Sequence, residues 1–263
     1  MLFISITVDG WRNGHARVLR PGGVPAELRD APPGRTLLLN VSAVARQAGA
    51  EFLGTGLLVT VVIGSGIAAQ RLSPGDAGLQ LLENSSATAL GIAVLIVVFQ
   101  PVSGAHLNPV VTLTDRVLNT ARTLSMTLTY LAAQLTGAVG GAVLANAMFG
   151  AATTISTRDR LDAGHLLAEV VATAGLVLVI FVLVRTGRAA FVGPVVGAYI
   201  GAAYWFTSST SFANPAVTIG RIFSDTFAGI APVSALWFVG AQVVGGALGL
   251  ALVLLLFPRK ATP

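Results

Sequence analysis

Two Asn-Pro pairs carry the clearest chemistry in this sequence, Asn108-Pro109 and Asn214-Pro215. Each pair follows a short apolar run and opens a segment of helical pattern that is too short to cross a bilayer core of about 30 Å. Asn is a favoured helix N-cap, and Pro fits the first helical position because its missing N–H would have no partner there. We therefore expect two short helices, each beginning at an Asn-Pro pair.

A single Asn-Pro pair predicts only a turn or an ordinary helix cap. Two pairs in matched halves of a membrane chain predict re-entrant half-helices, whose irregular backbone is tolerated at membrane depth where it lines a cavity. The two helix N-termini would then face each other, each with about half a positive charge. The asparagine amides can turn N–H donors toward the same point. A neutral polar solute could accept hydrogen bonds there, whereas a proton or cation would meet a barrier.

Two carboxylates, Glu51 and Glu169, lie in long apolar runs, one in each half. An acidic residue at the centre of a membrane helix costs about 2.5–3.5 kcal/mol even on an insertion scale. The pair could form a proton relay or an ion ligand, or each could accept hydrogen bonds from exposed N–H groups of a re-entrant segment. Their matched placement favours this supporting role, and the sequence offers no third acidic group to continue a relay.

The composition places the chain in a membrane. Of its 263 residues 54% are hydrophobic and 10% are charged, against roughly 25% charged in soluble domains. The basic residues lie at the ends of apolar runs, which favours topogenic signals over nucleic-acid binding. With no cysteine, three scattered histidines and no nucleophile–base pair, the sequence predicts no metal site, no cofactor and no enzymatic activity.

Six apolar runs are long enough, or nearly so, to cross the bilayer as helices. They cover residues 48–69, 87–103, 124–147, 166–184, 189–206 and 233–257. The short segments that open at the Asn-Pro pairs, 108–117 and 214–223, follow the second and fifth runs. The predicted fold is therefore all-α, with six transmembrane helices and two re-entrant half-helices.

The two halves of the chain repeat one pattern. Ala-Glu-Phe-Leu-Gly-Thr at 50–55 matches Ala-Glu-Val-Val-Ala-Thr at 168–173, and the segments entering the Asn-Pro pairs match as well. Each half has an odd number of spans, so the second half inserts upside down relative to the first. An inverted repeat places a site between the halves at the midplane. We predict one channel domain over residues 41–260, with repeats at 45–148 and 163–257.

Residues 1–40 lack apolar periodicity and carry five arginines. We interpret them as a disordered extension or as an artefact of an upstream start codon. With a cytoplasmic N-terminus, twelve Lys and Arg residues fall inside and four outside, or seven against four without those up to Arg35. The sequence therefore predicts a multi-pass protein of the plasma (cell inner) membrane with both termini in the cytoplasm.

At these motifs the chain resembles the aquaporin, or major intrinsic protein, superfamily. The resemblance rests on the motif at 50–55, on Ser-Gly-Ala-His-Leu-Asn-Pro at 103–109 and on Asn-Pro-Ala at 214–216. It implies an aquaporin-like bundle that assembles as a homotetramer with one pore per subunit. The residues that it places at the pore motifs are Asn108, Pro109, Val110, Asn214, Pro215 and Ala216.

The resemblance also implies a selectivity filter at the outer mouth. Family members usually have an arginine directly after the second Asn-Pro-Ala, and here that position is Val217. Carried over by spacing from the asparagines, the other filter positions are Thr88, Ala202 and Ser211. These four residues predict a wide, neutral constriction, because the guanidinium with its rigid donor fork is missing. A larger neutral solute than water should pass.

Two further residues are candidates beside the filter. Arg221 lies one helical turn beyond Val217 and could partly replace the missing charge. Alternatively it could lie at the end of the half-helix, where it caps the helix or pairs with Asp225. His106, in the first motif, is the other filter-adjacent candidate.

The segments at 212–218 and 223–230 resemble the bacterial aquaporins found beside arsenic-resistance genes. This subgroup implies an aquaglyceroporin-like passive channel for small uncharged solutes such as arsenite, methylated arsenicals, glycerol and water. One alternative is a water and glycerol facilitator without an arsenic role. Another is a proton-coupled secondary transporter that uses Glu51 and Glu169. The expected partners are the lipid bilayer, the solute and further copies of the chain, and not nucleic acid.

Overall fold

The computed structural model describes residues 33–258, with side chains from residue 43 onward, and every regular element in that range is a helix. In chain order the elements are α2 (Pro33–Leu72), α3 (Ala77–Ser103), α4 (Pro109–Leu118), α5 (Leu124–Met148), α6 (Ala163–Arg185), η2 (Ala189–Phe191), α7 (Val192–Phe206), α8 (Pro215–Gly220), η3 (Arg221–Phe223) and α9 (Pro232–Leu256). Among the described residues, six helical stretches are long and apolar enough to cross a membrane. They correspond to the six predicted runs.

The predicted extension over residues 1–40 lies outside the described residues up to position 32. Residues 33–40 are helical, since they form the first part of α2. The expectation of an irregular segment is therefore wrong for residues 33–40.

The second span is longer than the sequence predicts, since α3 begins at Ala77 and not at residue 87. Its first turns carry polar side chains that are buried inside the bundle, Gln80 and Asn84 among them. Asn84 donates to the backbone oxygen of Val62, and Gln80 donates to that of Ser73. A hydropathy pattern misses such turns because the polar groups find protein partners and not lipid.

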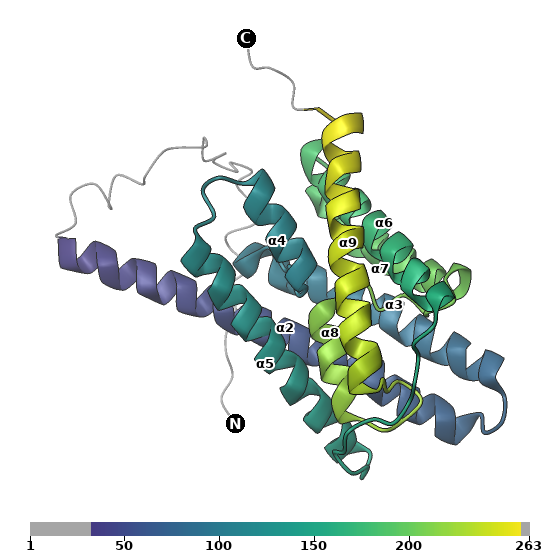
Figure 1. Ribbon diagram of the computed structural model, residues 1–263. Coiled ribbons are helices and arrows are strands. Elements are labelled where there is room, and N and C mark those ends of the chain that lie inside the picture. The colour runs from purple at the N-terminus through teal and green to yellow at the C-terminus, as the bar shows by residue number, and fades with distance from the viewer. Residues whose placement is uncertain (1–32, 259–263) are drawn as a thin grey trace, which may run out of the picture. The chain divides into compact units, whose positions relative to one another are not determined.

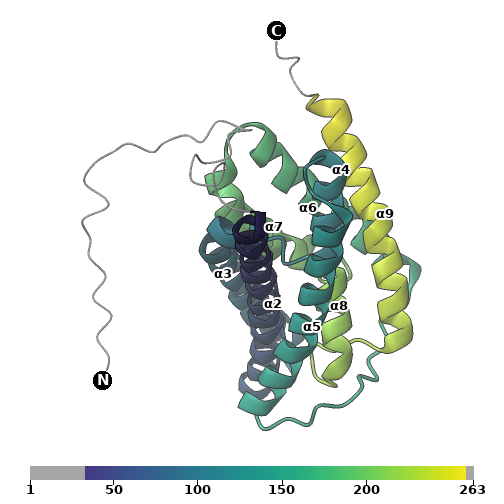
Figure 2. The same cartoon turned by 90° about the vertical axis from the view of Figure 1, so that its left-hand side faces the viewer.

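The described elements divide into two matching sets, α2–α5 and α6–α9, each with three long helices and one short one. The short helix of each set packs against the last long helix of both sets, so that α4 contacts α5 and α9, and α8 contacts α9 and α5. Figures 1 and 2 show α4 beside the later part of α9 and α8 beside its earlier part. The half-helices therefore approach the same region of the bundle from opposite ends.

Glycines let the long helices of each set approach closely. A Cβ on Gly141 of α5 would lie 2.1 Å from the backbone oxygen of Gly56 in α2. In the second set a Cβ on Gly249 of α9 would lie 2.6 Å from the oxygen of Ala174 in α6. Small residues at helix crossings are the usual means of packing in membranes, where lipid gives little hydrophobic drive between helices.

Candidate pore and its two mouths

Each half-helix begins at its asparagine, as the sequence predicts. The side-chain oxygen of Asn108 accepts from the N–H of Val110, and that of Asn214 accepts from the N–H of Ala216. Each amide nitrogen also donates across to the other half, from Asn108 to the oxygen of Ala213 and from Asn214 to the oxygen of Leu107, both at 2.8 Å. The two asparagines therefore cap their own helices and join the two re-entrant segments, residues 104–107 and 207–213.

The backbone that enters each asparagine is strained. Non-glycine residues with positive φ are concentrated in the two segments: Ala105, Leu107, Thr210, Ser211 and Ala213. Such conformations cost of order 1–3 kcal/mol each and persist only where the surroundings fix them. Something must therefore hold both segments in place.

The carboxylate of Glu51 holds the first segment. It accepts from the N–H groups of His106 and Leu107, at 3.0 and 2.7 Å. It also accepts from the hydroxyl of Ser103 and from the amide of Gln134 in α5, at 2.6 and 2.7 Å. Both oxygens therefore accept two bonds.

Glu169 holds the second segment in the same way. It accepts from the N–H groups of Phe212 and Ala213, both at 2.9 Å. The hydroxyl of Ser209 and the amide of Gln242 in α9 donate to it at 2.6 Å each. Four hydrogen bonds to each fully buried carboxylate indicate a structural support. They use the acceptor sites of both oxygens, so neither oxygen is free to take part in a proton relay.

A cavity of ≈ 290 Å³ runs between the two halves. Its walls come from α2, α3, α6, α7, both re-entrant segments and both half-helices, and both asparagines line it. On α3 the lining extends from Thr88 to Gln100, which spans roughly 18 Å at 1.5 Å per residue. We call the end near Gln100 and Asp115 the α4 mouth, and the end near Thr88 and Arg221 the α8 mouth.

Three of the four predicted filter positions lie at the α8 mouth, and the fourth does not. Thr88, Ser211 and Val217 line the cavity and are buried. Ala202 is exposed and is not part of the cavity wall, so its assignment is wrong. Tyr204 of the same helix lines the cavity instead, and its hydroxyl donates to that of Thr88 at 3.2 Å.

The periodicity of α7 explains this correction. The residues of this helix that line the cavity recur every fourth position: Val192, Val196, Ile200 and Tyr204. Residues four apart share one face of a helix, whereas Ala202 is two positions from both Ile200 and Tyr204 and faces away. The filter position on α7 was located by counting residues back from Asn214. That count runs through the irregular segment between α7 and α8, and it ends two residues away from the cavity-lining face of α7.

Arg221 lies inside the cavity wall and not at the surface. Its guanidinium carbon is 3.4 Å from the centre of the Phe212 ring, and its Nε donates to the backbone oxygen of Ala228. Asp225 instead accepts from the backbone N–H and the hydroxyl of Thr157. The expected pairing of Arg221 with Asp225 is therefore wrong, although Arg221 does directly follow the last residue of α8.

The connection between the two halves, residues 149–162, braces the α8 mouth. The N–H of Ser156 donates to the oxygen of Ile222 in η3, and Arg160 donates to the oxygens of Phe227 and Gly229. Figure 2 shows this connection on the side of the bundle where α8 and the start of α9 lie. Burial and the neighbouring positive charge of Arg158 lower the pKa of Arg160 to about 10. The residue keeps its charge at neutral pH.

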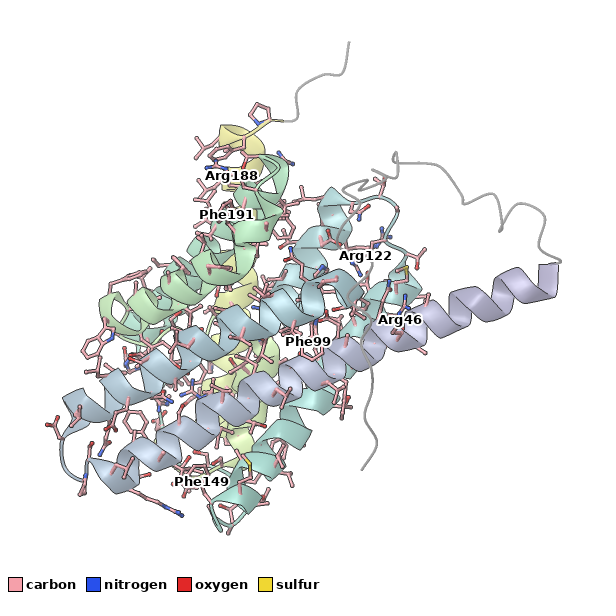
Figure 3. The ribbon with its side chains drawn as sticks, turned by 180° about the vertical axis from the view of Figure 1, so that it is seen from behind. Arg46, Phe99, Arg122, Phe149, Arg188 and Phe191 are labelled. Atoms are coloured by element: carbon pink, nitrogen blue, oxygen red, sulfur yellow. The ribbon has the colours of Figure 1, made fainter. Side chains whose placement is uncertain are left out.

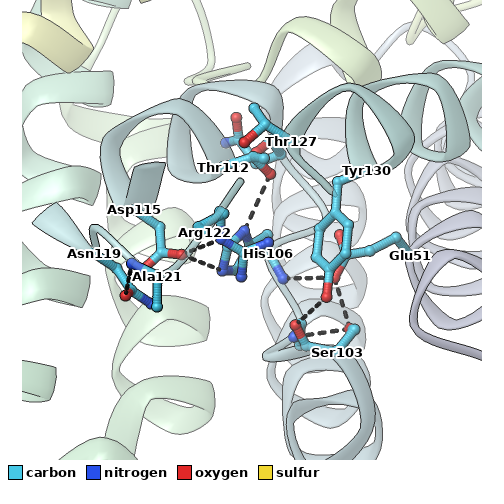
Figure 4. Close-up of polar contacts among 12 residues, drawn as sticks. Glu51, Ser103, His106, Thr112, Asp115, Asn119, Ala121, Arg122, Thr127 and Tyr130 are labelled. Atoms are coloured by element: carbon cyan, nitrogen blue, oxygen red, sulfur yellow. Dashed lines mark hydrogen bonds and ion pairs between the residues drawn. The ribbon is translucent and has the colours of Figure 1, made fainter. Parts of the chain in front are cut away.

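The α4 mouth holds a different cluster (Figure 4). Asp115 pairs with Arg122, and its carboxylate oxygen is 3.8 Å from Nε2 of His106. The guanidinium of Arg122 lies 4.6 Å from the centre of the Tyr130 ring. His106 and Asp115 line the cavity, so His106 lies at the mouth opposite the predicted filter and is not adjacent to it.

The two mouths show what the sequence reasoning missed. Asp115 is the seventh residue after Asn108, and Arg221 is the seventh after Asn214. Both line the cavity. Alignment of the two halves on their asparagines would have identified this shared position, whereas Tyr204 and Phe212 gave no such signal.

Comparisons with known proteins agree with this geometry. The sequence profile described as major intrinsic protein matches residues 39–212. The aquaglyceroporin AqpS of Rhizobium meliloti (strain 1021) is 45% identical over 210 residues, which cover 80% of this chain and 89% of that protein. The propanediol uptake facilitator PduF of Salmonella typhimurium is 38% identical over 108 residues, 41% of this chain and 39% of that protein.

A solved structure is similar in fold. The X-ray structure of the aquaglyceroporin from Plasmodium falciparum matches with a TM-score of 0.62 at 24% identity. The match covers 80% of this chain and 95% of that one. At this identity the similarity supports the aquaporin fold alone.

Proposed function

Because this chain belongs to the major intrinsic protein family, we propose that it is a passive channel for small uncharged solutes. The observation that carries the proposal is the cavity between the two halves, with Asn108 and Asn214 in its wall. Each asparagine amide has two N–H donors and gives one to the opposite segment, so a second donor is available to a passing solute. The two helix N-termini disfavour cations at the same point.

The cargo that we propose is a small polyol or a polyol-like hydroxide. Glycerol and arsenous acid are our principal candidates, with methylated arsenicals and water as further cargo. The hydroxyls of Thr88, Tyr204 and Ser211 in the cavity wall support this class. The relatives named as an aquaglyceroporin and a propanediol uptake facilitator support small polyols, whereas the arsenic role rests on the resemblance of residues 212–230 alone.

A proton-coupled transporter is the weaker candidate. Coupling would need a carboxylate that can take up and release a proton in the pathway. Glu51 and Glu169 are fully buried, and each accepts four hydrogen bonds from its own half. Protonation would break part of that support for the re-entrant segments.

We also propose a homotetramer in the plasma membrane with both termini in the cytoplasm. The basic residues support the orientation. Figure 3 shows Arg122 and Arg188 toward one end of the bundle and Phe149 toward the other. An excess of Lys and Arg at one end favours a cytoplasmic position for that end.

Osmotic swelling of proteoliposomes tests the channel proposal. We expect the purified chain to pass glycerol, 1,2-propanediol and arsenous acid at rates linear in the gradient, with no acidification reported by an internal pH dye. Val196 lines the cavity, whereas the neighbouring Val195 is exposed. Val196→Trp should therefore block the flux and Val195→Trp should retain it. Wild-type permeability equal to that of empty liposomes for every solute would refute the channel.

The same assay separates the candidates for cargo. Flux of glycerol without flux of arsenous acid would indicate a polyol facilitator without an arsenic role. Saturating flux that depends on a pH gradient would support the transporter.

A further inference from the structure

We propose that Arg221 supplies the guanidinium of the α8 mouth, one helical turn beyond the position where the family usually has it, and that together with Ser211 it selects solutes by their hydroxyl groups. The inference rests on the proposed channel function and concerns the residues that set its cargo. Position 217 itself holds a valine. The expectation of a filter without a guanidinium therefore holds for that position and not for the mouth as a whole.

The side chain of Arg221 is buried but keeps donors for a ligand. Only 2% of the residue is exposed, yet it lines the cavity. Among the described residues its guanidinium makes one hydrogen bond, from Nε to Ala228, and no ion pair includes it. Its two terminal nitrogens make no hydrogen bond among the described residues, and because the residue lines the cavity we infer that they face it.

Helix geometry explains how a residue at 221 can serve a filter at 217. Long side chains on a helix lean toward its N-terminus and cover the preceding turn. Arg221 immediately follows α8, one turn after Val217, and its guanidinium lies on the Phe212 ring in the re-entrant segment that precedes α8. The Nε bond to Ala228 and the ring contact fix this placement.

Ser211 provides independent support for a ligand at the same mouth. Its hydroxyl oxygen is buried and has no hydrogen-bond partner among the described residues. A buried hydroxyl without a partner costs about 1–3 kcal/mol, and Ser211 lines the cavity. Because the oxygen has almost no accessible surface in this conformation, the side chain must rotate toward the cavity before a passing solute can satisfy it. Thr88 and Tyr204 complete the polar side, while Val217 and Phe212 form the apolar side.

This arrangement specifies a chemical class. The solute must accept from a guanidinium, exchange a hydrogen bond with a hydroxyl and place carbon against Val217 and Phe212. A short vicinal diol or triol meets these requirements. A cation does not, because the guanidinium of Arg221 forms no ion pair among the described residues. This guanidinium therefore repels a cation that enters the mouth.

Two substitutions of Arg221 by unbranched side chains of similar length distinguish the effect of its charge from the effect of its size. Arg221→Met keeps an unbranched side chain but removes the charge, whereas Arg221→Lys keeps the charge. In proteoliposomes we expect Arg221→Met to raise the permeability ratio of xylitol to glycerol on the order of tenfold, because a constricting group with charged hydrogen bonds is lost. We also expect it to raise proton leak several-fold, and we expect Arg221→Lys to retain proton exclusion.

Arg160 provides the matched control. It contacts the same ring but does not line the cavity. Arg160→Met should leave the polyol ratio and the proton leak at wild-type values, even if the protein becomes less stable. If Arg160→Met changed the polyol ratio and the proton leak as much as Arg221→Met does, the proposal would be overturned.

Ser211→Ala keeps the proposal testable if the Arg221 variants fail to fold. Its hydroxyl has no hydrogen-bond partner in the part of the chain that the structure describes, so the variant should fold as wild type. We expect the permeability ratio of glycerol to 1,2-propanediol to fall several-fold, because a hydroxyl partner for the solute is lost. An unchanged ratio would contradict the inference, as would an Arg221→Met channel with wild-type selectivity. Neither result affects the channel proposal, which fails only if the wild type passes no neutral solute.

Discussion

At the α4 mouth the seventh residue after the asparagine is Asp115, and at the α8 mouth it is Arg221. Both line the cavity, but their surroundings differ. Asp115 is paired with Arg122, so its charge is compensated within its own half. No ion pair among the described residues compensates Arg221. The inverted repeat thus determines where the seventh side chain lies, and the surroundings determine whether its charge acts on the solute.

The hydrogen-bonded supports of the two re-entrant segments match between the halves. Glu51 and Glu169 each accept from two backbone N–H groups, one serine and one glutamine. Pairs of aromatic rings also match, since His106 lies edge-on to Tyr130 as Phe212 does to Phe238. Both halves share the glutamate support, whereas the charged residue at each mouth differs. Changes to the glutamates should therefore affect folding, and changes to the charged residues at the mouths should affect selectivity.

The largest effect is expected at the shared support. Glu51→Ala and Glu169→Ala should each abolish permeability and greatly lower the yield of folded protein in detergent. Each change leaves several buried donors without an acceptor, at about 1–3 kcal/mol apiece. Size-exclusion profiles and glycerol flux measure the outcome. Asp162→Asn is the control, because Asn also caps a helix and Asp162 caps α6. A functional channel from only one of the two glutamate variants would break the equivalence of the halves.

A smaller loss is expected where the long helices cross. Gly141→Ala would place its Cβ 2.1 Å from a backbone oxygen of α2, and overpacking of this kind costs roughly 1–3 kcal/mol. For Gly240 in α9, no atom of the described residues lies within 4 Å of an added Cβ. Gly240→Ala should therefore be as stable as wild type or more so in thermal unfolding. Equal unfolding temperatures for the two variants would show that the close approach of α2 and α5 is not needed.

The smallest effect is expected from Asp115. Asp115→Asn removes a charge that Arg122 already compensates, at a site that is only partly buried. The xylitol-to-glycerol ratio should change less than twofold, against roughly tenfold for Arg221→Met. Equal changes at the two mouths would mean that selectivity does not reside at the α8 mouth.

The features predicted correctly from the sequence are those that local chemistry determines. The six spans follow from apolar runs, and the half-helices follow from Asn-Pro as cap and first turn. The start of α3 at Ala77 was missed because its polar residues are paired inside the bundle. Ala202 was misplaced because a fixed count was carried across the irregular backbone between α7 and α8.

The sequence by itself determined the membrane solvent, the inverted repeat and the two asparagine caps, since each depends on residue type and spacing along the chain. Only the tertiary structure decided which side chains share the α8 mouth. Tyr204 reaches it from α7, Thr88 from α3 and Arg221 from the end of α8. These positions are brought together by the packing of the two halves. Whether Arg221 acts on a solute depends on which carboxylates and carbonyls packing places beside it.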